Sequence, residues 1–213
     1  MSLLLSKLYP ITDVRVSGLS HAEQVARLSA GGATLVQLRE KQLSPREFYL
    51  EAQEALRVAR ERGVRLLIND RVDIALALGA DGVHLGQDDL GPLAARRLLG
   101  PTAIIGFSTH NIEQATKAAR LPVDYIAIGP IYPTSSKENP DPTVGVEELR
   151  RVRRAIGPIP LVAIGGITRL NARAALLAGA DSVACISDLL ARPAEIEERT
   201  REFIHGLETQ NPE

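Results

Sequence analysis

Two aspartates and three basic residues of this sequence are of the types found in sites that bind a metal ion together with a phosphorylated ligand. Asp70 and Asp89 are nineteen residues apart, and each follows a short apolar run. Such a pair suits a hard cation like Mg²⁺, which takes one or two carboxylates and fills its other positions with water and phosphate oxygens. Arg39, Lys41 and Lys137 would add a guanidinium fork and two ammonium charges, a combination that fits a diphosphate. We therefore expect a metal–polyphosphate site.

A second candidate anion site lies in the segment AIGGIT at residues 163–168. The paired glycines Gly165 and Gly166 would leave backbone N–H groups open to an anion, and a helix expected to begin near Thr168 would add positive partial charge. Ile186 and Ser187 end a later apolar run and are expected beside the glycines. A monophosphate held there would be separate from the metal site, so the sequence predicts two phosphorylated substrates.

Each of these features also has a simpler explanation. Asp70 would serve as the N-cap of a helix, and Asp88 or Asp89 as a cap or a loop turn. The segment QLREK at residues 37–41 fits a solvated loop, and Gly165 with Gly166 fits a tight turn. The case for a site depends on whether the fold brings these residues together.

Short apolar runs rich in β-branched residues recur along the chain and predict eight strands. The expected strands are Leu8 to Thr12, Thr34 to Leu38, Arg65 to Ile68, Gly82 to Leu85, Ile104 to Phe107, Tyr125 to Ile128, Pro160 to Ile164 and Ser182 to Ile186. Helical segments separate them: Ser20 and Ser44 are each followed three residues later by glutamate, which is the spacing of a capping box. Eight strand–helix units in 213 residues predict an α/β fold, a single-domain (β/α)8 TIM barrel over residues 1–213.

In such a barrel the active groups lie at the carboxyl ends of the strands, and polar residues of this sequence follow seven of the expected strands. They are Gln37, Arg39, Glu40 and Lys41, then Asn69 and Asp70, then Gln87, Asp88 and Asp89, then Ser108, Thr109 and His110, then the segment GPIYPTSSK, then Gly165, Gly166 and Thr168, and last Ser187 and Asp188. The segment YPTSSKENPDPTVG is expected to form either a mobile loop over this rim or a disordered connector. We expect His84 to pack in the barrel or on a helix, whereas His110 has no evident carboxylate partner in the sequence.

Composition restricts the kinds of partner. The formal net charge is −1, and no apolar stretch approaches the roughly 20 residues of a membrane span. We therefore expect small-molecule substrates, with no binding to nucleic acid and no insertion in a membrane. Cys185 is the only cysteine, which favours a reducing, cytoplasmic setting. The oligomeric state stays open.

Five blocks of the sequence, in order and over essentially the whole chain, resemble the thiamine phosphate synthase family. They are TLVQLREK, INDRVDIALALGADGVHLGQDD, IIGFSTH, YIAIGPIYPTSSK and VAIGGIT. The resemblance implies a (β/α)8 barrel that joins 4-amino-2-methyl-5-(diphosphooxymethyl)pyrimidine to 4-methyl-5-(2-phosphooxyethyl)thiazole. The products would be thiamine phosphate and diphosphate, and the cofactor Mg²⁺.

The resemblance also assigns roles to individual residues. Catalytic roles fall to Arg39, Lys41, Ser108 and Lys137, and metal binding to Asp70 and Asp89. The pyrimidine diphosphate would be held by Gln37, Leu38, Arg39, Glu40, Lys41, Asn69, Ser108 and Lys137. The thiazole phosphate would be held by Thr134, Ser135, Ser136, Gly166, Ile186 and Ser187. Asp188 is a departure from the small apolar residues that are commoner at this position, and it must point away from a phosphate.

The family mechanism is dissociative: the bond to the diphosphate breaks first, and the thiazole nitrogen captures the pyrimidine cation without a protein nucleophile. Three alternatives use the same fold. A thiazole tautomerase would lack a complete diphosphate–metal set, and a non-catalytic regulator that binds thiazole phosphate would tolerate loss of the carboxylates. A phosphosugar isomerase would need a general base at the rim, which the sequence does not identify.

Overall fold

The apolar runs of the sequence become eight parallel strands in the computed structural model, which describes residues 5–134 and 141–209. The strands are β1 (Leu8–Thr12), β2 (Leu35–Leu38), β3 (Arg65–Asn69), β4 (Gly82–Leu85), β5 (Ile104–Thr109), β6 (Tyr125–Ile128), β7 (Leu161–Ala163) and β8 (Ser182–Cys185). They pair in chain order, and β8 closes the barrel by pairing with β1. The expected (β/α)8 barrel is confirmed.

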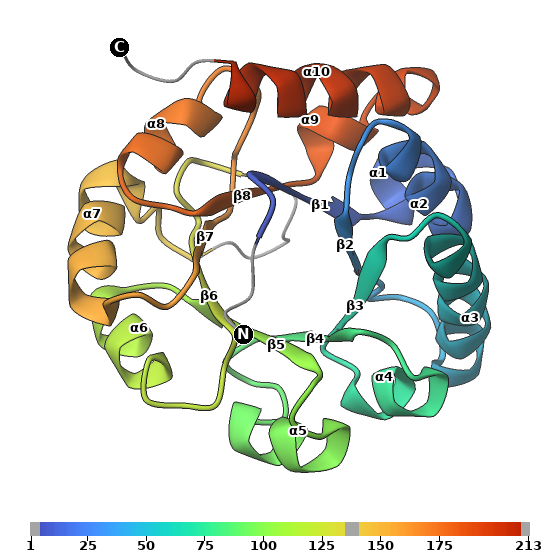
Figure 1. Cartoon of the computed structure of the whole chain (residues 1–213), viewed down its shortest axis with the longest axis horizontal. Coiled ribbons are helices and arrows are strands. Elements are labelled where there is room, and N and C mark those ends of the chain that lie inside the picture. The colour runs from blue at the N-terminus through green and yellow to red at the C-terminus, as the bar shows by residue number, and fades with distance from the viewer. Residues whose placement is uncertain (1–4, 135–140, 210–213) are drawn as a thin grey trace.

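Helices surround this ring of strands (Figure 1). They are α1 (Val14–Ser17), α2 (His21–Ala30), α3 (Pro45–Glu61), α4 (Val72–Leu78), α5 (Pro92–Leu99), α6 (Ile112–Ala118), α7 (Gly145–Ile156), α8 (Ala172–Leu177), α9 (Ser187–Leu190), the 3-10 helix η1 (Pro193–Glu195) and α10 (Ile196–Glu208). The capping boxes predicted at Ser20 and Ser44 both form, with Glu23 and Glu47 as the reciprocal partners. The short helices α1 and α9 extend the loops after β1 and β8 and were not expected.

Three boundaries near the seventh strand differ from the prediction, and β7 ends at Ala163, one residue before the expected Ile164. β7 begins at Leu161 rather than Pro160, because proline has no N–H to donate to a neighbouring strand. α8 begins at Ala172 rather than near Thr168, since a turn comes first in which the Asn171 side chain accepts a hydrogen bond from the Thr168 N–H at 2.8 Å. The glycine pair therefore leads into a loop and not directly into a helix.

Alternation along the strands separates an inner core from an outer one. Inside the barrel pack Tyr9, Ile11, Leu35, Leu67, Ile104, Tyr125, Ala127, Val162 and Ala184. Most of the other apolar strand residues belong to the larger core between the strands and the helices. Gln37 and Asn69 lie two positions beyond inward-facing leucines, so their buried side chains also point inward, close to the carboxyl ends of β2 and β3. The barrel interior thus becomes polar toward one rim.

The residue before β4, β6 and β8 is in each case an aspartate that secures the start of the preceding strand. A carboxylate oxygen of Asp81 accepts the Leu66 N–H at 2.8 Å, one of Asp124 accepts the Ile105 N–H at 2.7 Å, and one of Asp181 accepts the Leu161 N–H at 2.8 Å. These groups would otherwise be unpaired at the end of the barrel opposite the polar rim. Asp81 and Asp181 each end a Gly-Ala-Asp segment, at residues 79–81 and 179–181, so the recurrence of this segment has a structural reason.

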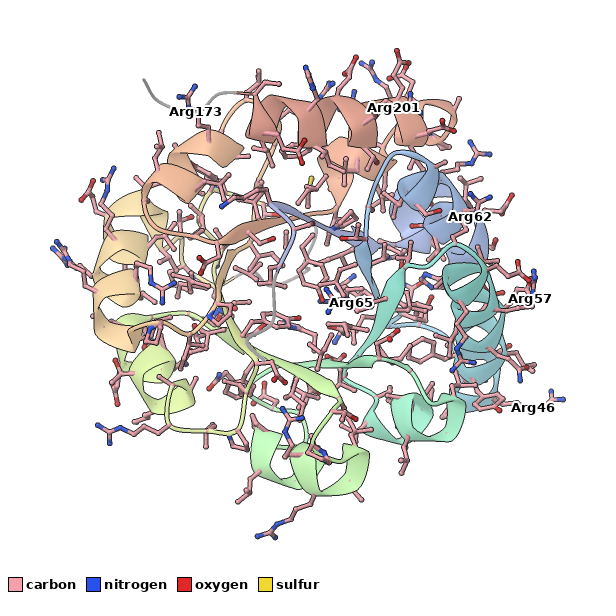
Figure 2. All side chains as sticks on the ribbon, in the orientation of Figure 1. Arg46, Arg57, Arg62, Arg65, Arg173 and Arg201 are labelled. Carbon is pink, nitrogen blue, oxygen red and sulfur yellow. The ribbon has the colours of Figure 1, made fainter. Side chains whose placement is uncertain are left out.

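Cationic side chains on the helices spread around the outside of the molecule. Figure 2 shows Arg46, Arg57, Arg62 and Arg201 directed outward from the helical ring. Arg57 has two acidic neighbours on its own helix, Glu54 and Glu61, at 2.6 Å and 2.5 Å. Among the described residues, none of the helices has the length and apolar character to cross a membrane.

Candidate functional site

A cleft of about 900 Å³ opens at the carboxyl ends of the strands. The predicted site residues that line it are Gln37, Arg39, Lys41, Asn69, Asp70, Asp89, Ser108, Thr134, Gly166, Ile186 and Ser187. They come from the ends of β2, β3, β4, β5, β7 and β8 and from the loop after β6. The fold therefore brings together residues separated by as much as 150 positions, as the TIM-barrel prediction requires.

Among the described residues, two predicted site residues, Leu38 and Glu40, do not line the cleft. The Leu38 side chain is fully buried in the core between strands and helices, so only its backbone lies near the rim. The Glu40 side chain borders a separate hollow behind the β2 loop. Ser135, Ser136 and Lys137 lie outside the described residues.

Asp70 and Asp89 form the acidic part of the cleft. The N-caps of α4 and α5 are Arg71 and Gly91, so neither aspartate occupies the capping position. Asp70 has a φ of +62°, which is uncommon for a residue other than glycine, and its carboxylate pairs with the Lys41 ammonium. One carboxylate oxygen of Asp89 accepts the Gly86 N–H at 2.7 Å and closes a loop turn, as the simpler explanation expects. This turn uses only one of the two carboxylate oxygens.

Burial and the neighbouring carboxylate of Asp70 raise the pKa of Asp89, although the Gly86 N–H and Lys41 oppose this. A bound divalent cation would relieve the repulsion that Asp70 exerts on the Asp89 carboxylate. Among the described residues there is no cluster of three or more potential His, Cys, Asp or Glu ligands. Two carboxylates are nevertheless enough for Mg²⁺, which keeps water and phosphate oxygens as its other ligands. The donor set fits that ion.

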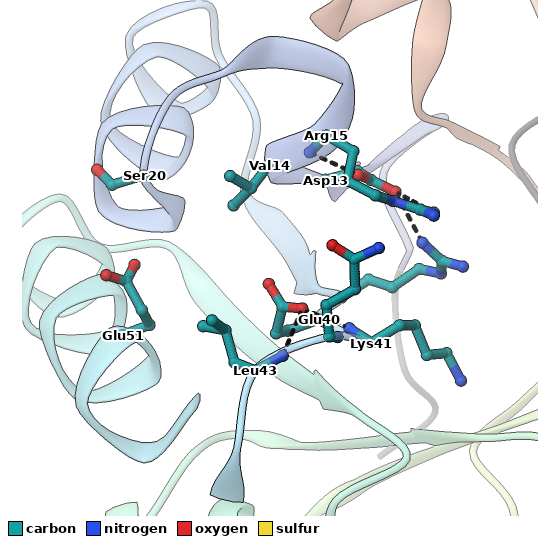
Figure 3. A pocket seen from close by; sticks show the side chains of 10 residues that line it. Asp13, Val14, Arg15, Ser20, Glu40, Lys41, Leu43 and Glu51 are labelled. Carbon is teal, nitrogen blue, oxygen red and sulfur yellow. Dashed lines mark hydrogen bonds and ion pairs between the residues drawn. The ribbon is translucent and has the colours of Figure 1, made fainter. Parts of the chain in front are cut away.

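Arg39 is held in place by Asp13, a residue that the sequence analysis did not identify. The Arg39 guanidinium lies 2.7 Å from the Asp13 carboxylate, whose side chain is only 4% exposed (Figure 3). The same carboxylate accepts the Arg15 N–H at 3.0 Å as the N-cap of α1. Asp13 directly follows β1, at the strand-end position where a barrel carries its site residues, and that position is the signal in the sequence that points to it.

Glu40 organises the loop that carries Arg39 and Lys41. Its carboxylate accepts backbone N–H groups from Lys41, Gln42 and Leu43 at 2.7, 2.6 and 3.2 Å. The other oxygen lies 3.3 Å from Nε2 of His21, which is fully buried (Figure 3 shows the loop). The Glu40 side chain is therefore occupied in shaping the β2 loop.

Ser108 lies over the barrel interior, with its hydroxyl 2.8 Å from Nε2 of His84. His84 is buried, as expected, and stacks on the Tyr125 ring with the centroids 5.5 Å apart. Burial lowers the pKa of His84 to about 4, so the imidazole is neutral near pH 7. A neutral ring donates from one nitrogen and accepts at the other.

The glycine pair at the end of β7 packs tightly against the loop that follows β6. Gly166 has a φ of +63°, and a Cβ added to it would come within 2.5 Å of the Pro133 carbonyl oxygen. A Cβ on Gly165 would meet Pro130 at 2.5 Å. The tight-turn interpretation is therefore correct, but it does not exclude anion binding, because both glycines also line the cleft beside Ser187.

Asp188, just beyond the end of β8, has two arginine partners. Asp188 is balanced by Arg199 of α10 at 2.9 Å and by Arg169 at 3.4 Å, so its charge does not stand alone beside the glycines. Sequence reasoning missed this role of Arg199, which lies on a helix far from any strand end.

His110 has a carboxylate neighbour, contrary to the expectation from the sequence: its Nδ1 lies 3.5 Å from Asp141 and 2.7 Å from the Gly129 carbonyl oxygen.

Comparisons with known proteins agree over nearly the whole chain. A family model described as "Thiamine monophosphate synthase" matches residues 8–189, a span that contains all eight strands. The thiamine-phosphate synthase of Koribacter versatilis is 50% identical over 212 residues, which cover 96% of this chain and 97% of the relative. That of Albidiferax ferrireducens is 47% identical, covering 94% and 93%. The solved structure of a thiamine phosphate pyrophosphorylase from Pyrococcus furiosus superposes with a TM-score of 0.84 at 36% identity, covering 95% of both chains.

Proposed function

From the premise that this chain belongs to the thiamine-phosphate synthase family, we propose how its cleft holds the two substrates of that enzyme. The reaction couples the pyrimidine diphosphate with the thiazole phosphate to give thiamine phosphate and diphosphate. One observation carries the proposal: Asp70, Asp89, Arg39 and Lys41 lie together at the ends of β2 to β4, and the glycine pair lies across the barrel at β7. The cleft thus has two separate places for phosphorylated groups.

The pyrimidine diphosphate lies over β2 to β5. Arg39, oriented by Asp13, presents its guanidinium fork to the diphosphate, and Lys41 supplies a second positive charge. Gln37, Asn69 and Ser108 provide neutral hydrogen-bonding groups at the bottom of the cleft. The backbone of the loop from Leu38 to Glu40 borders the same subsite, and Lys137 adds a third cation by its resemblance to the family.

Asp70 and Asp89 hold Mg²⁺. When bound, the ion would stabilise the negative charge that gathers on the departing diphosphate. Without a cation, the Lys41 ammonium compensates Asp70, and the loop from Gly86 to Asp89 keeps its own hydrogen bond. Lys41 therefore has two anionic partners in succession, first Asp70 and then the diphosphate.

The thiazole phosphate lies over β7 and β8. Gly166 and Ser187 form the cradle, with Ile186 beside them and Thr134 on the facing loop. Ser135 and Ser136 are assigned to the same phosphate by resemblance to the family. Arg199 and Arg169 balance Asp188, which removes the repulsion that this carboxylate would otherwise exert on a phosphate.

The chemistry requires positioning and charge stabilisation rather than a protein nucleophile. The carbon–oxygen bond to the diphosphate breaks, and its electron pair leaves with the diphosphate oxygen. Arg39 and Lys41 stabilise that charge, and the thiazole nitrogen then donates its lone pair to the pyrimidine methylene carbon. Cys185 takes no part, because burial raises its pKa to about 12 and keeps the thiol protonated.

We expect Arg39→Ala to raise KM for the pyrimidine diphosphate about tenfold, with KM for the thiazole phosphate unchanged. The reason is that a charge-assisted contact to the diphosphate alone is lost. Steady-state kinetics with each substrate varied in turn would measure this. Arg57→Ala, which removes an exposed arginine from the outer face of α3, is the matched control. An equal rise in both KM values would contradict the division into two subsites.

The lone cysteine, Cys185, is buried and forms no disulfide, which supports a reducing cytoplasmic location.

A thiazole tautomerase or a non-catalytic regulator would use the β7–β8 subsite alone. The joint placement of Asp70, Asp89, Arg39 and Lys41 favours the coupling reaction over both.

A further inference from the structure

A continuous chain of hydrogen-bonding groups crosses the barrel interior beneath the cleft. It begins at Gln37, whose Nε2 donates to the Tyr9 hydroxyl at 3.0 Å. The Tyr9 and Tyr125 hydroxyls lie 2.9 Å apart, and the Tyr125 hydroxyl lies 2.8 Å from Nδ1 of His84. The chain ends where Nε2 of His84 lies 2.8 Å from the Ser108 hydroxyl. It thus joins two residues of the pyrimidine subsite, Gln37 and Ser108, through three buried side chains.

The rings of this chain are fixed in place by their packing. Tyr9 and Tyr125 meet edge to face, with centroids 5.8 Å apart and planes at 88°. Tyr125 occupies the space over Gly106, where an added Cβ would come within 2.0 Å of the Tyr125 ring. His84 stacks on the Tyr125 ring, with the two planes at 20°. The hydroxyl and imidazole groups therefore have no freedom to exchange partners, and only their hydrogens can be arranged in different ways.

The direction of the hydrogen bonds follows from counting those hydrogens. With Gln37 Nε2 donating to the Tyr9 hydroxyl, every hydrogen of the chain has an acceptor only when Tyr9 donates to Tyr125 and Tyr125 donates to Nδ1 of His84, since the described residues offer no other acceptor for the Tyr9 hydrogen. His84 is neutral, so an accepting Nδ1 requires a proton on Nε2, which donates to the Ser108 oxygen. The Ser108 hydrogen is then left for a ligand in the cleft. At the other end, the Gln37 carbonyl oxygen is left as an acceptor.

We propose that Tyr9, Tyr125 and His84 are positioning residues that set Ser108 as a hydrogen-bond donor and Gln37 as an acceptor toward the pyrimidine diphosphate. The inference rests on the proposed function, in which Ser108 and Gln37 face that substrate. The barrel interior then has a role beyond packing: it fixes the hydrogen-bond direction of two groups that contact the substrate from β2 and β5, and it does so before the substrate binds.

The first test is the tautomer of His84 in the intact protein. Nitrogen-15 NMR of histidine-labelled protein, with the His84 signals assigned by their loss in His84→Gln, shows which ring nitrogen carries the proton. We expect a proton on Nε2 and none on Nδ1. A proton on Nδ1 would reverse the whole chain and overturn the inference.

The second test removes the Tyr125 hydroxyl from the hydrogen-bond chain and keeps the aromatic ring. Tyr125→Phe should lower kcat/KM for the pyrimidine diphosphate about tenfold, leave KM for the thiazole phosphate unchanged and give a mixture of His84 tautomers. Tyr49→Phe, the same chemical change on α3, is the control and should alter none of these. A Tyr125→Phe protein with unchanged kcat/KM for the pyrimidine diphosphate contradicts the proposal.

A double-mutant comparison separates this inference from the proposed function. If Tyr125 acts through Ser108, Tyr125→Phe should cause little further loss in a Ser108→Ala protein. Full additivity of the two losses would overturn the positioning role while leaving the subsite assignment intact. Ser108→Ala with no effect on the pyrimidine substrate would instead contradict the subsite itself, and the His84 tautomer would still decide the direction of the chain.

Discussion

Asp89→Ala should lower Mg²⁺-dependent turnover by about 10²-fold or more, because the charge that develops on the diphosphate would lose the ion held by this carboxylate. Steady-state rates measured over a range of Mg²⁺ concentrations should show both a lower maximum and a weaker dependence on the ion. Asp89 also accepts the Gly86 N–H, so the alanine variant removes a loop contact together with the charge.

Two companion variants separate these effects. Asp89→Asn keeps an oxygen that can accept the Gly86 N–H but removes the negative charge, and we expect it to be nearly as inactive as the alanine variant. Asp88→Ala removes the adjacent, exposed carboxylate and should retain normal turnover. Unchanged activity and metal dependence in Asp89→Ala would remove Asp89 from the metal site.

Gly166→Val should raise KM for the thiazole phosphate by about 10²-fold and that for the pyrimidine diphosphate far less. The new Cβ would lie within 2.5 Å of the Pro133 carbonyl oxygen and 2.8 Å of Tyr132 Cβ, so the loop after β6 would have to move away from the phosphate cradle. Binding of each substrate, followed by calorimetry, would measure the two effects separately. Thermal unfolding of the same samples would report on folding.

Gly157→Val provides the matched control for backbone strain. Gly157 has a φ of +65°, close to that of Gly166, but an added Cβ there has no neighbour within 4 Å. Both variants thus place a β-branched residue in the left-handed region, and only one disturbs the cleft. Equal losses for the two substrates in Gly166→Val, or the same losses in Gly157→Val, would argue against a separate thiazole phosphate site.

The barrel itself could be predicted from sequence because its signals are local. Three strands have the expected bounds, and the others differ at an end by one or two residues, as at Pro160. The start of α8 was wrong by four residues because Asn171 closes a turn after Thr168, and such side-chain turns compete with a helix start. The short helices α1 and α9 were missed because four residues carry no usable periodicity.

The rim could also be predicted, and Asp13 follows β1 at a strand end, but the contacts that orient the rim side chains could not be predicted. Parallel strands bring their carboxyl ends to one edge, which is enough to gather Arg39, Lys41, Asp70 and Asp89. The Asp13 contact with Arg39 depends on side-chain directions that only the folded chain defines.

The interior network is a second example of what the sequence could not provide. Tyr9, His84 and Tyr125 read in the sequence as ordinary residues of apolar strands, and a lone strand histidine is more often packed than functional. Their hydroxyl and ring nitrogen atoms meet only because barrel closure places β1, β4 and β6 around a common centre. Polar aromatic residues at inward-facing strand positions are the signal that could have found them.

The most direct test of the account is to mix the purified protein with both substrates and Mg²⁺ and to follow products and substrates together. We predict thiamine phosphate and diphosphate in equal amounts when both substrates are present, no thiamine phosphate when the thiazole phosphate is left out, and little product when Mg²⁺ is removed by a chelator. Isomerisation of the thiazole phosphate without release of diphosphate, or binding of the substrates without turnover, would contradict the account.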